Sequence, residues 1–402
     1  MIPKSAVVER RIVVAGAGIA GLTAALAFAA KGNAVTIFER AARLEEVGAG
    51  LQLSPNATRI LRSLGVLDAL RQNAVAPVAI VLKDARTLAS LARVPLGDAA
   101  EERWGAPYLV AHRADLQRAL LDTLGQVPAV TLTTGAEVIG ADLGLHGARI
   151  KLREQDGERE IEADLLVGAD GVWSGLRRLT AGKPSRYTGY VAYRAVLSRR
   201  LEGAIAPDAV TAVLSPDFHL IAYPLRGGTA TNLVVVARSA EIGRGWANVA
   251  DRVHLRRKME RAAPALSAII EDAGAWTAWP IHAVDGRGGW TDARGLALIG
   301  DAAHALSPYA AQGAAMAIED AAALAALTAG TADLPAALTT FEQVRSRRVR
   351  RVARRGDFNR FVWHAEGPAA LARNLVLRLR SGPSLAADLD WLYGYDADAK
   401  QP

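Results

Sequence analysis

One short stretch constrains the fold more than any other: residues 16–21, which read GAGIAG. The apolar run 11–15 before it predicts a strand, and the Ala/Leu-rich run 20–30 predicts a buried helix. A second apolar run, 34–38, predicts the next strand. Strand, glycine-rich turn, helix and strand together predict a βαβ unit of the Rossmann type.

The residues of this turn suit a dinucleotide. Gly16 permits the tight turn, Gly18 lets the backbone approach a pyrophosphate, and Gly21 allows the helix to pack closely on the strand. Glu39, at the end of the second strand, can accept hydrogen bonds from ribose hydroxyls. A glycine-rich turn without function is the alternative, and the motif alone does not choose between NAD and FAD.

Two further turns favour FAD. Asp301 follows the predicted strand 296–299 and precedes the predicted helix 311–327, whose positive end suits the negative charge of a reduced flavin. The stretch 168–178, GADGVWSGLRR, begins at the end of the predicted strand 165–169. Its alternative interpretation is an Asp–Arg salt bridge that closes a turn.

The middle of the chain predicts an inserted antiparallel sheet, with strands at 190–197, 212–214, 219–225 and 232–237. The fold class is therefore α/β: a discontinuous Rossmann-like FAD-binding domain, an inserted antiparallel β-sheet substrate domain that covers the cofactor, and C-terminal helices. The predicted FAD-binding domain comprises 1–72, 103–180 and 283–345, the substrate domain 73–102 and 181–282, and the helical segment 346–402.

Composition excludes several classes of chemistry. The 402 residues include no cysteine, so disulfides, thiolate metal sites and iron–sulfur clusters are excluded, and no metal is expected. The first ten residues lack the apolar core of a secretory signal, and no apolar run approaches about 20 residues. We therefore expect a cytoplasmic protein without a membrane span.

The net charge of +7 is concentrated in the run 345–355, RSRRVRRVARR. We expect a solvated helix face. Nucleic-acid binding is a weaker interpretation, because no aromatic residue is interleaved and no binding motif accompanies the run. A third interpretation is a basic surface that gathers anionic NAD(P)H or aromatic acids.

The chain carries a GxGxxG motif at 16–21, a DG motif at Asp170 and Gly171, and a GD motif at Gly300 and Asp301. In this order, the three motifs resemble the fingerprints of the class A flavoprotein monooxygenases, the p-hydroxybenzoate hydroxylase-like family. The likeness covers most of the chain and is greatest to the salicylate hydroxylase-like branch. The stretches that carry it are VGAGLQLSPNATRILRSLGVLDAL (47–70), LVAHRADLQRALLD (109–122), TGYVAYRAV (188–196), HLIAYPLRGG (219–228), GDAAHALSPYAAQGAAMAIEDAAALA (300–325) and WLYGYD (391–396).

The resemblance implies bound FAD and a transient NAD(P)H. It implies that FAD is held by Gly16, Gly18, Ala20, Gly21, Glu39, Arg40, Gln52, Arg113, Gln117, Asp170, Asp301, Pro308, Gln312, Gly313 and Ala314. It also implies the activity: NAD(P)H reduces FAD, O2 adds to give a C4a-hydroperoxyflavin, and a small aromatic substrate is hydroxylated. A monomer or a homodimer is expected, with no nucleic-acid partner.

Three other functions stay open. They are hydroxylation of a non-aromatic or antibiotic-like substrate, an FAD dehydrogenase activity, and a flavin-binding redox sensor that meets DNA or a partner through the run 345–355.

The strand 219–225 is the predicted pocket wall. His219 and Tyr223 share a strand face, and the resemblance implies that they bind or deprotonate a substrate phenol. The alternative for His219 is a satisfied core histidine. Tyr193 and Arg194 are predicted substrate contacts, but adjacent strand residues face opposite ways, so at most one points into the pocket.

Two further contacts are expected there. Tyr309 is predicted to set specificity, and Leu53, with Leu51, to form an apolar wall. No second arginine is evident for a carboxylate, so the sequence leaves open whether the substrate ring carries an acid group.

Overall fold

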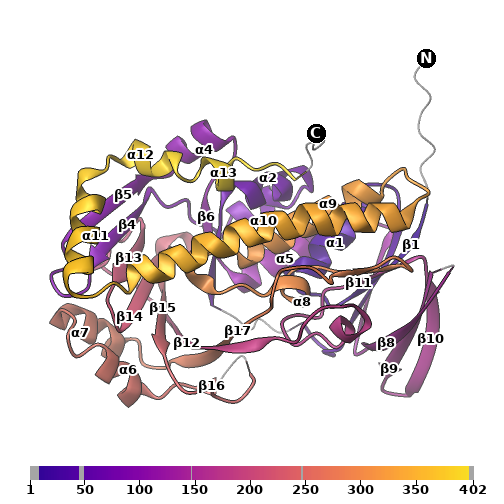
Figure 1. Ribbon diagram of the computed structural model, residues 1–402, viewed down its shortest axis with the longest axis horizontal. Coiled ribbons are helices and arrows are strands. Elements are labelled where there is room, and N and C mark those ends of the chain that lie inside the picture. Colours follow the sequence, from indigo (N-terminus) through magenta and orange to yellow (C-terminus); the bar gives the residue numbers. More distant parts are fainter. Residues whose placement is uncertain (1–8, 45–48, 146, 246–247, 398–402) are drawn as a thin grey trace.

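The computed structural model describes residues 9–44, 49–145, 147–245 and 248–397. The first eight residues, and residues 47–48 of the first resembling stretch, lie outside the described part. The strands and helices predicted from apolar patterns form close to their predicted bounds. Two large sheets lie side by side and a long helix bridges them (Figure 1).

The first large sheet has six strands in the order β18-β19-β11-β1-β2-β7, parallel except for β18. Its strands are β1 (Arg11–Ala15), β2 (Ala34–Glu39), β7 (Val130–Thr134), β11 (Leu165–Gly168), β18 (Thr291–Asp292) and β19 (Leu296–Leu298). The apolar runs of β1, β11 and β19 are buried because helices cover a parallel sheet. Ala15 pairs with Gly168, and Gly168 with Leu298, so the three motif turns leave the sheet at one edge.

Helix α1 (Ile19–Ala29) packs against α9 (Gly313–Thr328) and α5 (Arg113–Leu124). Both α1 and α9 are rich in alanine and buried on nearly every side. Because their side chains are small, these helices can approach each other closely. A glycine-rich turn followed by a buried helix start requires such close packing.

The second large sheet has eight strands in the order β16-β17-β12-β15-β14-β13-β4-β5, antiparallel except for the β13–β4 pair. Its strands are β4 (Ala79–Asp84), β5 (Ser90–Pro95), β12 (Arg186–Leu197), β13 (Val210–Leu214), β14 (Phe218–Leu225), β15 (Ala230–Arg238), β16 (Asn248–Val249) and β17 (Thr277–Ala283). One face packs on α6 (Arg252–Lys258) and α7 (Pro264–Asp272). The opposite face is left for a cavity.

Smaller elements connect these sheets. The antiparallel pair β3 (Gly50–Leu53) and β6 (Leu109–His112) contacts the large sheet, where the Gly50 amide donates to Asn232 Oδ1 at 2.7 Å. The remaining elements are β8 (Glu137–Gly144), β9 (Gly147–Glu154), β10 (Gly157–Ala163), α2 (Pro55–Ser63), α3 (Leu67–Arg71), α4 (Asp98–Trp104), α8 (Asp301–His304), and the 3₁₀ helices η1 (Leu176–Leu179), η2 (Arg226–Gly228) and η3 (Pro308–Ala310).

Helix α10 (Leu334–Trp363) runs along most of the molecule, from the six-stranded sheet to the eight-stranded one (Figure 1). It is continuous through residues 345 and 346, where the sequence predicts a segment boundary. Helices α11 (Gly367–Leu379), α12 (Gly382–Ala387) and α13 (Asp390–Tyr393) follow it, and α11 and α12 pack on β5. None of the described helices is both long and apolar enough to cross a membrane.

The prediction that the run 345–355 is a solvated face is wrong for two of its arginines. Arg345 is fully buried, and it pairs with Glu319 at 2.7 Å and Asp320 at 2.8 Å. Arg348 is also buried and pairs with Glu319 at 2.8 Å. Because α9 buries two carboxylates, which are costly without partners, the facing side of α10 must supply cations.

Of the other arginines of the run, Arg347, Arg351 and Arg354 are exposed, whereas Arg350 and Arg355 are half-buried. The run is therefore an amphipathic helix face whose inner side is ionic rather than apolar.

Candidate active site

The turn after β1 has the geometry that its glycines predict. Gly16 has φ +106°, and a Cβ there would lie 2.6 Å from the Ala169 carbonyl oxygen. A Cβ at Gly21 would lie 1.9 Å from the Gly16 oxygen, whereas one at Gly18 would meet no atom within 4 Å. Gly16 and Gly21 therefore shape the turn, and Gly18 leaves open space above the helix start.

A cavity of about 870 Å³ opens beside this turn. Gly16, Gly18, Glu39, Arg40 and Asp170 all line it. Glu39 Oε2 accepts from the Ala17 amide at 2.8 Å and Oε1 from the Ala41 amide at 2.9 Å, which fixes the carboxylate at the end of β2. A fixed carboxylate for ribose hydroxyls, with backbone amides and a cation for phosphates, fits the ADP half of FAD.

The loop after β11 is not closed by the Asp–Arg salt bridge that its sequence offered as an alternative. Asp170 Oδ2 accepts from the amides of Gly175 and Leu176, at 2.9 and 3.2 Å, and forms no ion pair with arginine among the described residues. Arg177 instead donates to the carbonyl oxygens of Ala302 and Asp301, at 2.8 and 3.0 Å. It thereby joins the loops that carry the DG and GD motifs.

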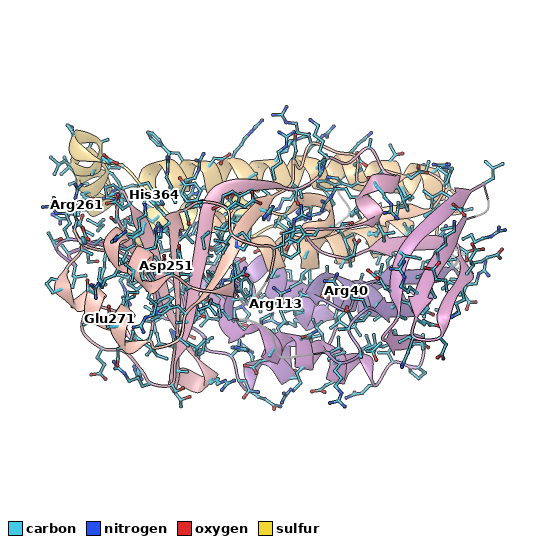
Figure 2. All side chains as sticks on the ribbon, turned by 90° about the horizontal axis from the view of Figure 1, so that it is seen from below. Arg40, Arg113, Asp251, Arg261, Glu271 and His364 are labelled. Carbon is cyan, nitrogen blue, oxygen red and sulfur yellow. The ribbon has the colours of Figure 1, made fainter. Side chains whose placement is uncertain are left out.

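A second cavity, of about 300 Å³, continues from the first, because both are lined by Gly18, Arg113, Ala169 and Gly171. Burial lowers the pKa of Arg113, while nearby Asp301 opposes that shift. Figure 2 shows Arg113 between Arg40 and His364 along the molecule. The second cavity is lined on its nucleotide side by Ala20, Gln52, Asp301, Pro308, Gly313 and Ala314.

The sheet side of this cavity carries His219, Ile221 and Tyr223, which share a strand face as predicted. Burial, and then nearby His364, lowers the pKa of His219 well below its ordinary value, so its imidazole is neutral at physiological pH. Burial raises the pKa of Tyr223, although Arg194 opposes the shift. Tyr223 is therefore a protonated hydrogen-bond donor, and His219 is a neutral group able to accept a proton.

Arg194 also lines this cavity, and its guanidinium stacks on the Trp279 ring at 3.9 Å. Its Nε is buried without a hydrogen-bond partner in the part of the chain that the structure describes. Burial lowers the pKa of Arg194 to about 10, with Tyr223 and Arg113 acting in opposite directions, so it is cationic at neutral pH. A buried cation without a counter-ion is costly, and the cavity offers room for an anion.

The packing of three residues contradicts the site roles predicted for their side chains. Tyr193 lies on the other sheet face, 6.4 Å from the His254 ring, so its prediction as a substrate contact is wrong. Leu51 lines the cavity, but Leu53 is fully buried in the main core and does not. Gln312 is buried, and its amide donates to Ser54 Oγ at 2.9 Å, so its side chain points into the interior.

Two further predicted residues lie just outside the cavity wall. Tyr309 is buried behind His219, with ring centroids 5.0 Å apart, and therefore supports that ring. Gln117 donates to the Ala17 carbonyl at 3.1 Å, which braces the glycine-rich turn.

Sequence reasoning missed Trp279, Trp363 and His364. The ring of Trp363 lies 5.1 Å from that of His219, and His364 Nε2 lies 3.2 Å from His219 Nδ1. His219 and His364 are separated by 145 positions, so no local pattern joins them. The only local signal is an aromatic residue next to a histidine, at positions 363 and 364, within the predicted C-terminal helical segment.

Comparison with known proteins agrees with this geometry. A model of the FAD binding domain family matches residues 9–356. The chain is 34% identical to 3-hydroxybenzoate 6-hydroxylase 1 of Aquipseudomonas alcaligenes, over 98% of this chain and 99% of the relative. It is 33% identical to 6-hydroxynicotinate 3-monooxygenase of Bordetella bronchiseptica, over 97% and 96%. Klebsiella pneumoniae HpxO, solved with FAD and uric acid, superposes with a TM-score of 0.80 at 26% identity, over 94% and 95% of the two chains.

Proposed function

This chain belongs to the class A flavoprotein monooxygenases, and we propose that it hydroxylates an aromatic acid whose carboxylate pairs with Arg194 and whose hydroxyl meets His219 and Tyr223. It is an FAD-dependent aromatic monooxygenase that consumes NAD(P)H and O2. The functions left open at the sequence level, a dehydrogenase, a hydroxylase of non-aromatic compounds and a redox sensor, are not favoured.

Bound FAD supplies the chemistry that accepts electrons and activates oxygen. For the residues that hold it, we propose Gly18, Glu39 and Arg40 at the nucleotide half, and Arg113 and Asp301 nearer the ring. The second cavity then holds both the ring and the substrate. Its buried walls exclude water, which favours oxygen transfer over release of H2O2.

The observation that carries the substrate proposal is the buried Nε of Arg194, which has no hydrogen-bond partner among the described residues, on a guanidinium stacked against Trp279. Trp279 stacking holds one face of the guanidinium and leaves its edge free for a bidentate pair with a carboxylate. The relatives named above act on 3-hydroxybenzoate and 6-hydroxynicotinate, both hydroxylated aromatic acids. Arg194 was one of two predicted substrate contacts on β12, and we propose it as the arginine that binds the carboxylate.

The spacing of the sheet supports one ring held at both ends. Arg194 lies on β12 and His219 on β14, and β15 alone separates these strands. Arg194 pairs with Val234 and His219 with Val236, so two strand spacings and an offset of two residues separate them by about 12 Å, a gap that an aromatic ring with a hydrogen-bonded group at each end can bridge. Residues of β15 between them, Val234 and Val236, provide an apolar floor for the ring.

The roles of His219 and Tyr223 follow from their protonation. Neutral His219 accepts the proton of the substrate hydroxyl, which makes the ring electron-rich. Protonated Tyr223 donates a hydrogen bond to the same oxygen and so stabilises the phenolate.

A panel of ring compounds tests the substrate class. We expect 3-hydroxybenzoate, salicylate and 6-hydroxynicotinate to stimulate NAD(P)H oxidation, and 3-hydroxybenzamide, the matched neutral control, to do so far less. A charge-assisted hydrogen bond contributes about 1.5–3 kcal/mol. Arg194→Gln should therefore raise the KM for the acid about 10- to 100-fold, with FAD content unchanged, and Arg194→Lys should recover part of the loss.

Two results would contradict the proposal. One is equal KM values for acid and amide in the wild-type protein. The other is loss of FAD, rather than of acid binding, in Arg194→Gln, because Arg194 would then serve the cofactor.

We also propose that the two large sheets are the cores of the predicted FAD-binding and substrate domains. A cytoplasmic location and a monomeric or homodimeric state complete the proposal. Light scattering of the FAD-loaded protein measures the last.

A further inference from the structure

The histidine that faces the cavity is joined to a second histidine from another element. His219 Nδ1 lies 3.2 Å from His364 Nε2, and His364 Nδ1 lies 3.0 Å from the Pro216 carbonyl oxygen. His364 follows the last residue of α10, whereas His219 and Pro216 belong to β14 and the turn before it. The chain of atoms runs from the cavity to a turn whose residues Pro216 and Asp217 are exposed.

The carbonyl at the end of this chain determines where each proton lies. A carbonyl oxygen only accepts, so His364 Nδ1 must carry a hydrogen and donate it. In the neutral ring, His364 Nε2 is then an acceptor, and His219 Nδ1 must donate to it. His219 Nε2 consequently bears a lone pair. It has no hydrogen-bond partner among the described residues, and the side chain lines the cavity.

The surroundings hold both rings in this arrangement. Tyr309, Trp363 and His364 pack around the His219 ring, with centroids 5.0, 5.1 and 5.4 Å away. Burial lowers the pKa of both histidines, which keeps the resting pair neutral. The titratable groups that face His364 are Asp217, Arg238 and Arg360, with Tyr190 and Tyr309 against its ring.

The two rings differ in how they can carry charge. His219 is 1% exposed, so a cation there would lack solvation. His364 is only half-buried, caps the C-terminus of α10, and lies near the Asp217 carboxylate. The negative end of a helix favours a positive imidazole, so charge that arrives at the pair is better held at His364.

We propose that His364 is the positioning residue of this site, which fixes the tautomer of His219 and carries the substrate proton to solvent. This inference rests on the proposed function for the identity of the proton donor. The hydroxyl O–H bond breaks and its proton bonds to His219 Nε2. The proton on His219 Nδ1 passes to His364 Nε2, which makes His364 an imidazolium whose Nδ1 hydrogen is donated to the Pro216 carbonyl oxygen. Water at the exposed turn then takes one proton from this imidazolium. One proton reaches solvent, a phenolate remains, and no electron moves.

The positioning role is tested without turnover. The chain has 7 histidines, so FAD-loaded protein with ¹⁵N-labelled histidine gives a spectrum simple enough to assign. We expect both His219 and His364 to carry hydrogen on Nδ1. His364→Gln, which keeps an acceptor, should leave the His219 tautomer unchanged, whereas His364→Leu should shift it. Hydrogen on His219 Nε2 in the wild-type protein, or an unchanged tautomer in His364→Leu, would overturn the role.

The proton-carrying role is tested with 3-hydroxy-4-nitrobenzoate, whose phenolate is coloured. After rapid mixing with FAD-loaded protein, we expect the phenolate to appear about 10- to 100-fold more slowly in His364→Gln than in wild type, since proton transfer through a positioned group contributes about 10²–10⁴-fold. Added imidazole should restore the rate in His364→Ala, because loss of this half-buried ring leaves a space beside the exposed turn. His254→Gln, a half-buried histidine outside the cavity, is the matched control and should behave as wild type.

A wild-type rate in His364→Gln overturns the proton-carrying role. A slow rate that imidazole does not restore, together with a lower melting temperature, also overturns it, because the loss would then be structural. If the wild-type protein does not bind the nitro compound, the proposed substrate class fails, and the tautomer measurement alone decides the role of His364.

Discussion

At the scale of single residues, the site is a set of polar groups whose burial sets their charge. His219 is neutral and Tyr223 protonated because desolvation disfavours their charged forms. Arg194 keeps its charge because guanidinium is so strongly basic. One neutral acceptor, one donor and one unpaired cation around a cavity match the three things a hydroxylated aromatic acid needs on binding.

His219 should control how much of the consumed NAD(P)H yields product. We expect His219→Ala to retain FAD and to oxidise NAD(P)H in the presence of substrate, but to hydroxylate about 10²–10⁴-fold more slowly and to release more H2O2. Tyr223→Phe should show a milder form, because it loses one hydroxyl and keeps the ring. The product-to-peroxide ratio, measured with a melting temperature, is decisive. An unchanged ratio in a less stable protein would make His219 a core histidine only.

At the scale of elements, strand pairing and buried ion pairs determine where each strand and helix lies. The register of β1, β11 and β19 brings three turns to one sheet edge. The ion pairs between α9 and α10 then hold the long helix whose far end supplies His364. The same helix thus contributes both to the stability of the FAD-binding sheet and to the wall of the substrate cavity.

Substitution by alanine should affect FAD binding at one glycine of the turn and folding stability at another. Gly18 has φ −76° and a Cβ there meets no atom, so Gly18→Ala should fold normally but bind FAD more weakly, because the methyl group occupies the phosphate approach. Gly21→Ala places a Cβ 1.9 Å from the Gly16 oxygen and should destabilise the fold itself. FAD titration and urea unfolding separate the two effects. Equal FAD affinity in Gly18→Ala and wild type would argue against the phosphate role.

The buried and exposed arginines of α10 should also differ. Removal of one partner of a buried ion pair costs about 3–5 kcal/mol, so Arg345→Gln should strongly lower the free energy of unfolding. Arg347→Gln, two residues along the same helix and exposed, should change it by less than about 0.5 kcal/mol. Urea unfolding of both variants provides the comparison. Similar losses would mean that the ion pairs contribute little.

At the scale of the whole molecule, much of the fold was predictable and less of the site. The βαβ unit, the discontinuous nucleotide sheet and the inserted antiparallel sheet each leave a local pattern: glycine spacing, apolar runs and strand alternation. The buried charges of Arg345 and Arg348 leave none, because a basic run looks the same whether its helix faces water or two buried carboxylates. His364 was missed for the same reason, since its role depends on where a 30-residue helix ends.

The most direct measurement is oxygen incorporation under ¹⁸O2. FAD-loaded protein, NAD(P)H and the preferred acid of the panel should give a hydroxylated product with one ¹⁸O atom, and Arg194→Gln should form the same product only at much higher acid concentration. Product whose new oxygen comes from water, or hydroxylation of neutral phenols as readily as of their acids, would contradict the account.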